Sequence, residues 1–172
     1  MTDTNITIYL STCCPWCRRV LAVLKEVGAH YEVVSIDLTL PRPEWYLKIN
    51  PKGQVPTLLY DGKILTESGV IAQFLADLYP SHLVKPSNAP GGALQRAEYA
   101  LFVSKFLEVV QKPVMGGIFA NKGVLAEEAQ EMVAAMARSL EPELKTAGPF
   151  FGGSETFTLV EVSFFSFLFF FF

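Results

Sequence analysis

The stretch "STCCPWCRRV" (residues 11–20) holds all three cysteines of a 172-residue chain, at a point where the predicted secondary structure changes from strand to helix. The preceding residues, "NITIYL" (5–10), are β-branched and aromatic enough for a short buried strand. Pro15 stands where proline is favoured, just inside a helix start, and apolar residues then recur at helical spacing until Gly28. The cysteines are therefore predicted to lie at a strand–helix junction.

The following residues continue an α/β pattern. "YEVVSIDL" (31–38) predicts a second strand, parallel to the first because a helix joins them. "PEWYLKIN" (43–50) predicts one or two helical turns, and "QVPTLLYDGKILT" (54–66) predicts a hairpin that turns at Asp61–Gly62. A third amphipathic helix follows "TES" (66–68). The order predicts an α/β sandwich with a mixed four-stranded sheet.

The second half of the chain has a helical pattern. "PSHLVKPSNAPGG" (80–92) is rich in proline and glycine without periodicity, which is typical of a linker. Two apolar stripes at helical spacing follow, within residues 101–110 and 129–144, and Pro142 is expected to kink or end the second helix. The predicted organisation is an α/β domain, a linker and an all-helical domain, over residues 1–80, 81–92 and 93–172.

The segment "FTLVEVSFFSFLFFFF" (157–172) holds 8 of the 14 phenylalanines. Thr158 and Glu161 have the spacing of a capping box, which predicts a helix start. The uncharged stretch after Glu161 has 11 residues, fewer than the roughly 17–25 that span a bilayer. We therefore expect a buried core helix here; an aberrant or truncated chain end is the alternative.

Composition narrows the class of protein. Hydrophobic residues make up 51% and charged residues 18%, which is typical of a globular protein. The net charge is −3 and no basic block of five residues occurs, so we expect no nucleic-acid partner. An odd number of cysteines cannot form a complete disulfide framework, which favours a reducing compartment and a cytoplasmic location. The first ten residues lack the features of a secretory signal.

The cysteines allow three interpretations: a metal site, inert packing or redox chemistry. A structural zinc site needs four ligands, and only His30 and His82, each placed singly, could complete one, so we expect no metal. Buried inert cysteines are common, and a lone cysteine would be interpreted that way. A pair spaced C-x-x-C at a helix start instead indicates redox or nucleophilic use.

The pattern also ranks the three cysteines. Cys14 is at the cap position, where free backbone N–H groups and the helix dipole stabilise a thiolate, with a pKa of roughly 3.5–7.5. Arg18 and Arg19 lie in the first turns and are expected to add positive potential. Cys14 is therefore the predicted nucleophile, Cys17 the predicted resolving thiol, and Cys13 is predicted to be a packing residue.

The motifs together resemble a known family. "CCPWC" before a helix, "RPEWYLKINPKGQVPTL" (42–58) and "LTESGVIAQFL" (65–75) are similar to the omega-like, cysteine-dependent class of the glutathione transferases. The resemblance covers about residues 5–160 and is strongest over 5–80. That class normally has no second cysteine in its motif, so Cys17 brings the chain closer to the dithiol glutaredoxins.

The resemblance carries several implications. It implies a thioredoxin-like N-terminal domain, a helical C-terminal domain, glutathione as co-substrate and a homodimer. Members of the family usually run beyond 200 residues, so the helical domain is expected to be incomplete.

Glutathione carries one ammonium and two carboxylates, and the start of the third helix has groups that suit one end of it. The free N–H groups there and the Ser68 hydroxyl can bind a carboxylate, while Glu67 can take the ammonium. The resemblance implies that these two residues hold the γ-glutamyl end. An ordinary helix cap is the alternative for Ser68, and the two roles are compatible.

The resemblance also implies roles for four further residues. Val55–Pro56 would have a cis bond opposite the reactive cysteine and would offer the Val55 backbone to the cysteinyl residue of glutathione. Arg42 would meet the glycyl carboxylate, with a solvated surface arginine as the alternative. Trp16 would flank the thiol, or simply pack.

The helical domain is expected to supply a pocket for the second substrate. Four of its apolar residues are candidates, although a plain core position is the more favoured interpretation for each: Phe102, Phe106, Met115 and Phe119.

The predicted function is a glutathione-dependent thiol transferase or reductase. The Cys14 thiolate would attack a glutathione mixed disulfide or an oxidised small molecule such as dehydroascorbate. The disulfide substrate would be a small molecule or a protein. Conjugation of glutathione to electrophiles is an alternative and would need a hydroxyl donor, for which Tyr9, Ser11 and Thr12 are nearby. A non-catalytic, membrane-associating module similar to intracellular chloride-channel proteins is another alternative, although a membrane partner is not expected.

Overall fold

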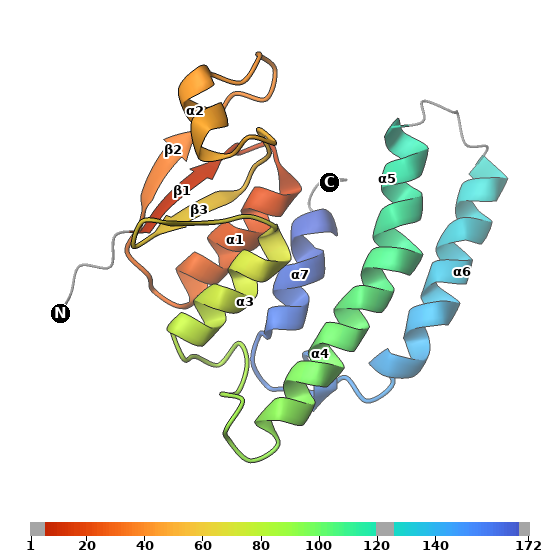
Figure 1. Cartoon of the computed structure of the whole chain (residues 1–172). Helices are drawn as coiled ribbons and strands as arrows, with labels where there is room; N and C mark the ends of the chain where they lie inside the picture. Colours follow the sequence, from red (N-terminus) through yellow and green to blue (C-terminus); the bar gives the residue numbers. More distant parts are fainter. Residues whose placement is uncertain (1–5, 120–125, 169–172) are drawn as a thin grey trace.

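A computed structural model describes the backbone of residues 6–119 and 126–168, and the side chains of residues 6–116 and 130–164. One four-stranded sheet lies beside a group of helices (Figure 1). The strands are β1 (Ile6–Leu10), β2 (Glu32–Ser35), β3 (Thr57–Tyr60) and β4 (Lys63–Leu65), in the order β2-β1-β3-β4. β2 runs parallel to β1, whereas β3 is antiparallel to both β1 and β4, so the predicted mixed sheet is confirmed.

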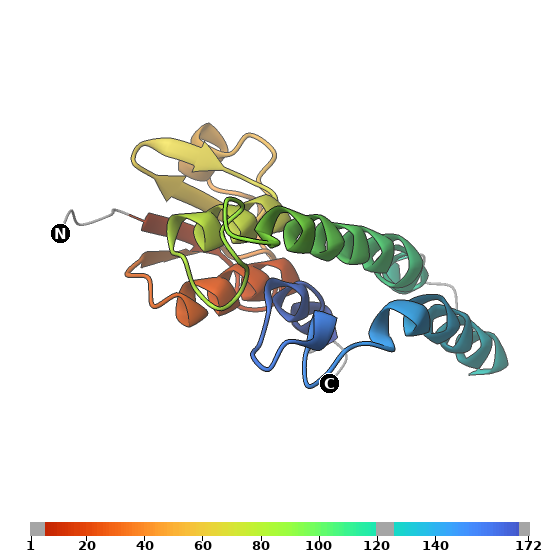
Figure 2. The same ribbon diagram turned by 90° about the horizontal axis from the view of Figure 1, so that it is seen from below.

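The helices follow the predicted order. The first half of the chain forms α1 (Pro15–Glu26), α2 (Glu44–Ile49) and α3 (Ser68–Leu78). The second half forms α4 (Gly92–Phe106), a π-helical segment (Leu107–Gln111), α5 (Lys112–Phe119), α6 (Ala126–Leu144), a 3-10 turn (Phe151–Gly153) and α7 (Leu159–Leu168). Figure 2 shows α4 and α5 as one continuous rod that extends away from the sheet.

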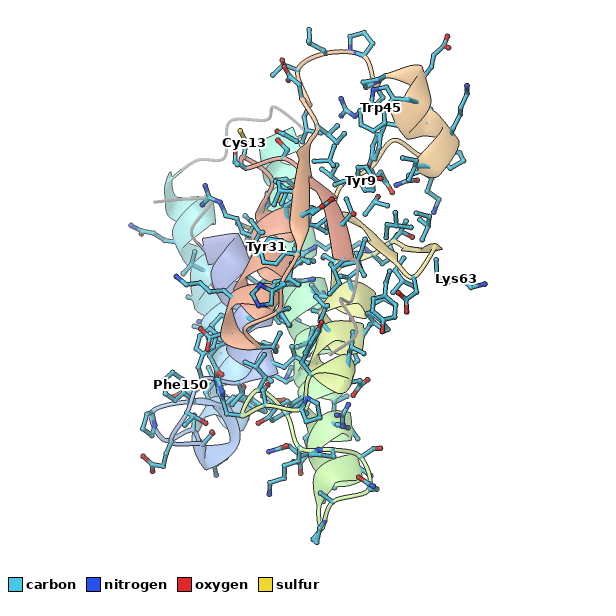
Figure 3. All side chains as sticks on the ribbon, turned by 90° about the vertical axis from the view of Figure 1, so that its left-hand side faces the viewer. Tyr9, Cys13, Tyr31, Trp45, Lys63 and Phe150 are labelled. Atoms are coloured by element: carbon cyan, nitrogen blue, oxygen red, sulfur yellow. The ribbon has the colours of Figure 1, made fainter. Side chains whose placement is uncertain are left out.

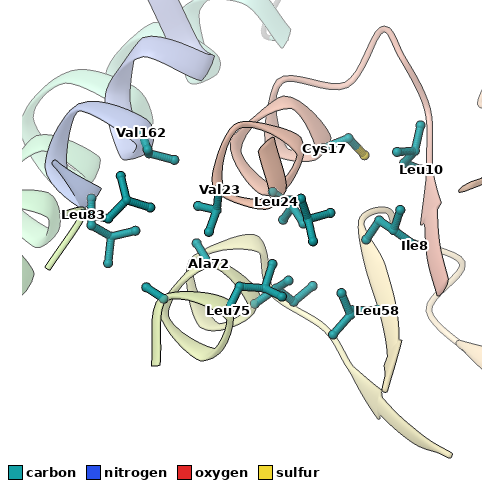
Figure 4. Packing of buried hydrophobic residues seen from close by; sticks show 14 of the residues in the cluster. Ile8, Leu10, Cys17, Val23, Leu24, Leu58, Ala72, Leu75, Leu83 and Val162 are labelled. Atoms are coloured by element: carbon teal, nitrogen blue, oxygen red, sulfur yellow. The ribbon is translucent and has the colours of Figure 1, made fainter. Parts of the chain in front are cut away.

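The central strand β1 is buried on both of its faces, which explains why its sequence shows no polar alternation. Ile8 points to one face, where α1 and α3 cover it (Figure 4). The next residue, Tyr9, points to the other face, where its ring lies 5.5 Å from that of Tyr46 in α2. The loop that follows β1 is therefore anchored in the core of the protein.

The described part of the phenylalanine-rich segment is a buried helix, as predicted. α7 packs against α1, α3 and α4, so it lies between the sheet side and the outer helices (Figure 1). Val160 and Val162 are almost fully buried there. The capping box is confirmed, because the backbone N–H of Thr158 donates to Glu161 Oε2 at 2.9 Å. The Phe169–Phe172 run lies outside the described residues.

The stripes predicted in the helical half are partly wrong. Leu101 and Val133 are 73% and 61% exposed, so they lie outside the buried faces of α4 and α6. Other members of the two predicted stripes are buried as expected: Phe102, Phe106, Met136 and Leu140. Within the first stripe, the ring of Phe102 packs against that of Phe151, with ring centroids 4.5 Å apart. Pro142 lies two residues before the end of α6, in keeping with its expected role as a helix stop. The predicted domain boundaries stay a prediction.

Within the ranges that the structure describes, no helix is long and apolar enough to cross a membrane.

Candidate active site

The loop after β1 presents Cys14 at the start of α1. Cys14 is the N-cap residue, with extended backbone angles (φ −85°, ψ 120°), and Pro15 begins the helix. The backbone N–H of Cys14 donates to the Ser11 carbonyl at 3.1 Å, which closes the loop. The sequence-predicted junction is therefore present, and the thiol lies over the N–H groups of the first helical turn.

Cys17 lies one turn into α1, beneath Cys14, and is fully buried. Its thiol donates to Cys14 Sγ, and this hydrogen bond is the main reason why the pKa of Cys14 falls to about 6. The backbone N–H groups of Cys17 and Trp16 lower that pKa further, while burial opposes them. Holding the shared proton raises the pKa of Cys17 well above its ordinary value, and burial adds to this. At neutral pH, Cys14 is the thiolate and Cys17 the thiol.

Arg18 and Arg19 were expected to add positive potential at the Cys14 thiolate, but neither is a cause of its low pKa. Arg18 is exposed, and its Nε donates to the Thr12 carbonyl at 3.3 Å. Arg19, one residue further round the helix, is buried and points to α3 instead. The low pKa of Cys14 comes from the Cys17 thiol and backbone N–H groups.

Cys13 was predicted to be a packing residue, and this is wrong. It is exposed (Figure 3). It also borders the same cleft as Cys14. Residues 12–13 form the turn between β1 and α1, outside the sheet, so the apolar pattern of the strand does not extend to them.

The loop before β3 faces Cys14. The Val55–Pro56 bond is cis, as the sequence resemblance implied, and both residues are buried. The Val55 carbonyl oxygen lies 3.8 Å from Cys14 Sγ and accepts its hydrogen when the thiol is protonated. Two side chains behind the loop hold it in place: the Tyr46 hydroxyl donates to the Gln54 carbonyl at 2.5 Å, and Asn50 Nδ2 donates to the same oxygen at 3.0 Å. Sequence reasoning missed these two supports.

Arg42 is half-buried, so the alternative of a solvated surface arginine is wrong. Its Nε donates to the Gly53 carbonyl at 2.9 Å, and its Nη1 donates to the carbonyls of Asp37 and Leu40. Gly53 has a φ of +61°, and a Cβ there would lie 2.9 Å from Arg42 Cγ, so only glycine allows this close approach. Arg42 therefore joins two loops while also bordering the cleft.

The start of α3 forms the opposite end of the site. Glu67 is exposed, with a left-handed φ of 66°, and directly precedes the helix. Ser68 is buried, and its Oγ accepts a hydrogen bond from Arg19 Nη1 at 3.0 Å. The ordinary capping role considered for Ser68 is absent, because no side-chain cap hydrogen bond forms at this described helix start.

These loops surround one open cleft of about 1060 Å³. Cys17 does not border the cleft, because it lies beneath Cys14. The other residues predicted for the site all do: Cys14, Trp16, Arg42, Val55, Pro56, Glu67 and Ser68. Lys52 also borders it and gives a second cation near Arg42, which the sequence did not single out.

Comparisons with known proteins agree with this geometry. The family model for the glutathione S-transferase N-terminal domain matches residues 13–78. Glutathione S-transferase omega-1 of Rattus norvegicus is 33% identical over 157 residues, which cover 87% of this chain and 61% of the relative. A probable glutathione S-transferase DHAR1, cytosolic, of Oryza sativa subsp. japonica is 32% identical over 142 residues, covering 81% and 59%. Residues 13–78 therefore match the glutathione S-transferase N-terminal domain, and the chain is similar to omega-class members of the glutathione transferase superfamily.

Solved structures of glutathione transferases share the fold. Glutathione transferase Omega 3C from Trametes versicolor superposes with a TM-score of 0.78 at 24% identity, over 96% of this chain and 72% of that one. Rice GST1, solved in complex with glutathione, gives a TM-score of 0.78 at 26% identity, over 95% and 73%. The present chain spans about three fifths of the length of the rat and rice relatives named above.

The second wall of the cleft includes only one of the described candidates from the helical half, and two others take the core positions that were the favoured interpretation. Phe102 and Phe106 do not border the cleft, because they pack in the core against other phenylalanines. Of the candidates, Met115 does border it, and the side chain of Phe119 lies outside the described residues. The described wall on the rod of α4 and α5 is Leu107, Gln111 and Met115.

The wall residues, of which Leu107 and Gln111 were not predicted, share one face of the helix. Leu107, Gln111 and Met115 are spaced by four and run through the π-helical segment, a feature that often marks functional sites. Gln111 Oε1 is buried without a hydrogen-bond partner in the described part of the chain. The regular spacing of these residues was a usable signal. The π-helical segment that places them at the cleft has no simple sequence signature.

Proposed function

We propose that this chain is a glutathione-dependent thiol transferase or reductase that acts through the Cys14 thiolate. The observation that carries the proposal is the Cys14–Cys17 pair, in which a buried thiol donates to a cleft-facing sulfur and lowers its pKa to about 6. A thiolate at neutral pH is the species that attacks disulfides. Relatives named as omega-class and DHAR glutathione transferases support the same chemistry.

Glutathione is the proposed co-substrate, since a related structure is a glutathione complex. Its γ-glutamyl carboxylate would lie at Ser68 and the first N–H groups of α3, with its ammonium near Glu67. The Val55 backbone would pair with the cysteinyl residue, which brings the glutathione sulfur to Cys14 Sγ. Arg42 would attract the glycyl carboxylate.

Two further residues border the proposed glutathione subsite. Lys52 would add a second cation at the glycyl end, and Trp16 would cover the thiol from the helix side.

The reaction proceeds by two thiol–disulfide exchanges. The Cys14 thiolate attacks the glutathione sulfur of a mixed disulfide, the sulfur–sulfur bond breaks, and the substrate thiolate leaves and takes up a proton. A second glutathione thiolate then attacks the Cys14–glutathione disulfide, which releases oxidised glutathione and restores the Cys14 thiolate. Cys17 could instead displace glutathione and form a Cys14–Cys17 disulfide. With dehydroascorbate as the oxidant, two glutathione molecules supply the two electrons and two protons.

Conjugation of glutathione to electrophiles has less support. That reaction needs a neutral hydroxyl beside the glutathione sulfur, and Tyr9, Ser11 and Thr12 were the candidates. None of the three borders the cleft. Tyr9 packs on Tyr46, and the backbone N–H of Ser11 donates to Cys17 Sγ at 3.5 Å.

The deciding experiment compares three activities of the purified chain. Coupled reduction of hydroxyethyl disulfide with glutathione is expected to exceed conjugation to a chloronitrobenzene, and partitioning into lipid vesicles is expected to be small. Faster conjugation than reduction would favour the transferase alternative. Vesicle binding without turnover would favour the membrane-associating module.

We also propose a cytoplasmic location, because all three cysteines are free and a reducing compartment keeps them so. The rice relative is described as cytosolic.

Substitution of the proposed γ-glutamyl site gives a first prediction. Glu67→Ala and Ser68→Ala are each expected to weaken glutathione binding by about 1–3 kcal/mol, the cost of leaving charged or buried partners without their hydrogen bond. Isothermal titration calorimetry measures the change. Glu44→Ala is the matched control, since Glu44 is an acidic residue in the first turn of another helix. Unchanged affinity in both site variants would rule out this subsite.

A homodimer is the proposed assembly. Exposed apolar side chains lie on β4, α3 and α4, among them Leu94 and Leu101, which are seven residues apart and so share one face of α4. Leu101 is 73% exposed, and the resemblance implies a partner subunit.

Leu101→Glu is therefore expected to convert a dimer to a monomer in analytical ultracentrifugation, because it places a charge in an apolar contact. Leu144→Glu, at an exposed apolar position of α6, is the control and is expected to leave the dimer intact. A wild-type chain that sediments as a monomer would refute the proposal.

A further inference from the structure

Arg19 is a buried cation at the edge of the cleft, and no carboxylate among the described residues forms an ion pair with it. Its side chain is 4% exposed, yet it borders the cleft together with Ser68. Burial lowers the pKa of Arg19 to about 10, so the guanidinium is still charged at neutral pH. In the described ranges no Asp or Glu side chain forms an ion pair with it. Because an uncompensated buried charge is costly, this position favours an anionic ligand.

The hydrogen bonds of Arg19 go to neutral acceptors. Nη1 donates to Ser68 Oγ at 3.0 Å, and Nη2 donates to the Ser163 carbonyl of α7 at 2.6 Å. Nε is buried and has no hydrogen-bond partner among the described residues. The guanidinium carbon lies 5.4 Å from the centroid of the Trp16 ring, a cation–π contact. A guanidinium has five N–H donors, so part of its capacity is unused.

A second positive feature lies at the same place. Arg19 Nη1 is 3.8 Å from the position that a Cβ on Gly69 would take, so the guanidinium lies against the first turn of α3. The free N–H groups of a first helical turn carry partial positive charge. Glu67 precedes this turn, but it is exposed and forms no ion pair with Arg19. An anion bound at this end of the cleft would be stabilised by both positive features.

We propose that Arg19 is a positioning residue that forms the positive floor of a carboxylate subsite at the start of α3. The inference rests on the proposed function, and the carboxylate is the α-carboxylate of the γ-glutamyl group of glutathione. Arg19 occupies a lone pair of the Ser68 oxygen, so the Ser68 hydroxyl proton is free to point into the cleft. Arg19 would then donate to Ser68, and Ser68 would donate to the carboxylate of the ligand, so both hydrogen bonds point toward the negative charge.

The bond to Ser163 links this subsite to α7. The same guanidinium therefore holds the start of α3 and the last described helix in a fixed relation, which keeps Ser68 in place before the ligand arrives.

The test compares two ligands on the full chain: glutathione and γ-aminobutyryl-cysteinyl-glycine, which keeps the amine but lacks the α-carboxylate. We expect the wild type to bind glutathione at least about tenfold more tightly, because charge-assisted hydrogen bonds to the carboxylate are strong. In Arg19→Met this preference is expected to fall to about twofold or less. Arg19→Lys keeps the charge but not the planar donors, and is expected to give an intermediate preference. Calorimetry measures both affinities for each variant.

A merely structural role for Arg19 would weaken the two ligands equally, and an unchanged preference in Arg19→Met would overturn the inference. If Arg19→Met does not fold, the wild type still decides: its Arg19 Nε nuclear magnetic resonance signal, assigned with Arg19→Lys, is expected to shift with glutathione and not with the analogue. Equal shifts with both ligands would also overturn the inference. Failure of the wild type to bind glutathione would instead refute the proposed function, so the two failures are distinguishable.

Discussion

Cys14→Ser is expected to lower the rate of glutathione-dependent disulfide reduction by about a thousandfold, the scale of losing the nucleophile of a covalent mechanism. The pKa of Cys14 is about 6, so the wild type presents a thiolate at neutral pH. A serine hydroxyl at the same helix start stays protonated and cannot exchange with a disulfide. The coupled hydroxyethyl disulfide assay measures the loss.

Cys13→Ser is the matched control, because it removes the neighbouring exposed thiol from the same cleft and should leave the rate nearly unchanged. Partial labelling with iodoacetamide at pH 6, followed by peptide mapping, identifies the reactive sulfur directly. Label that appears first on Cys13 or Cys17 would contradict the assignment. This control is needed because Cys13 is exposed, whereas the sequence had suggested a buried position for it.

The sheet and its helices could be predicted because each element has its own periodic pattern and turn residues. The Asp61–Gly62 hairpin turn is an example: both residues have the positive φ that such a turn requires, 44° and 74°. The cysteine loop was equally predictable, since Pro15 fixes where α1 begins. Patterns of this kind are local, and the structure follows them closely.

The misplaced residues depend on contacts between distant elements. Arg19 was expected beside the thiolate, but its orientation is set by Ser68 and Ser163, which are 49 and 144 residues away in the chain. Whether Phe102 packs in the core or borders the cleft depends on the position of Phe151. A single sequence has no signal for such pairings. It therefore indicated which residues belong to the site, but not which side chains those residues contact.

Cys17 tests whether the buried thiol activates Cys14 or only resolves a disulfide. In Cys17→Ala the sulfur donor is lost, and we expect the pKa of Cys14 to rise from about 6 to about 8, since a hydrogen bond to the charged form is removed. At pH 6 the thiolate fraction, and with it the iodoacetamide rate, then falls by about fifty-fold. Above both pKa values Cys14 is fully ionised in either protein, so the two rates converge near pH 10.

Cys17→Ser separates the two roles, because its hydroxyl is still a donor but cannot form a disulfide. We expect its alkylation profile to lie between those of the wild type and Cys17→Ala, while both variants lose the Cys14–Cys17 disulfide. Both should retain reduction of glutathione mixed disulfides at high pH, since a second glutathione can resolve the intermediate. Identical pH profiles for the wild type and Cys17→Ala would mean that the helix start alone sets the pKa of Cys14. Activation by the buried thiol would then be wrong, even if Cys17 still resolved the disulfide.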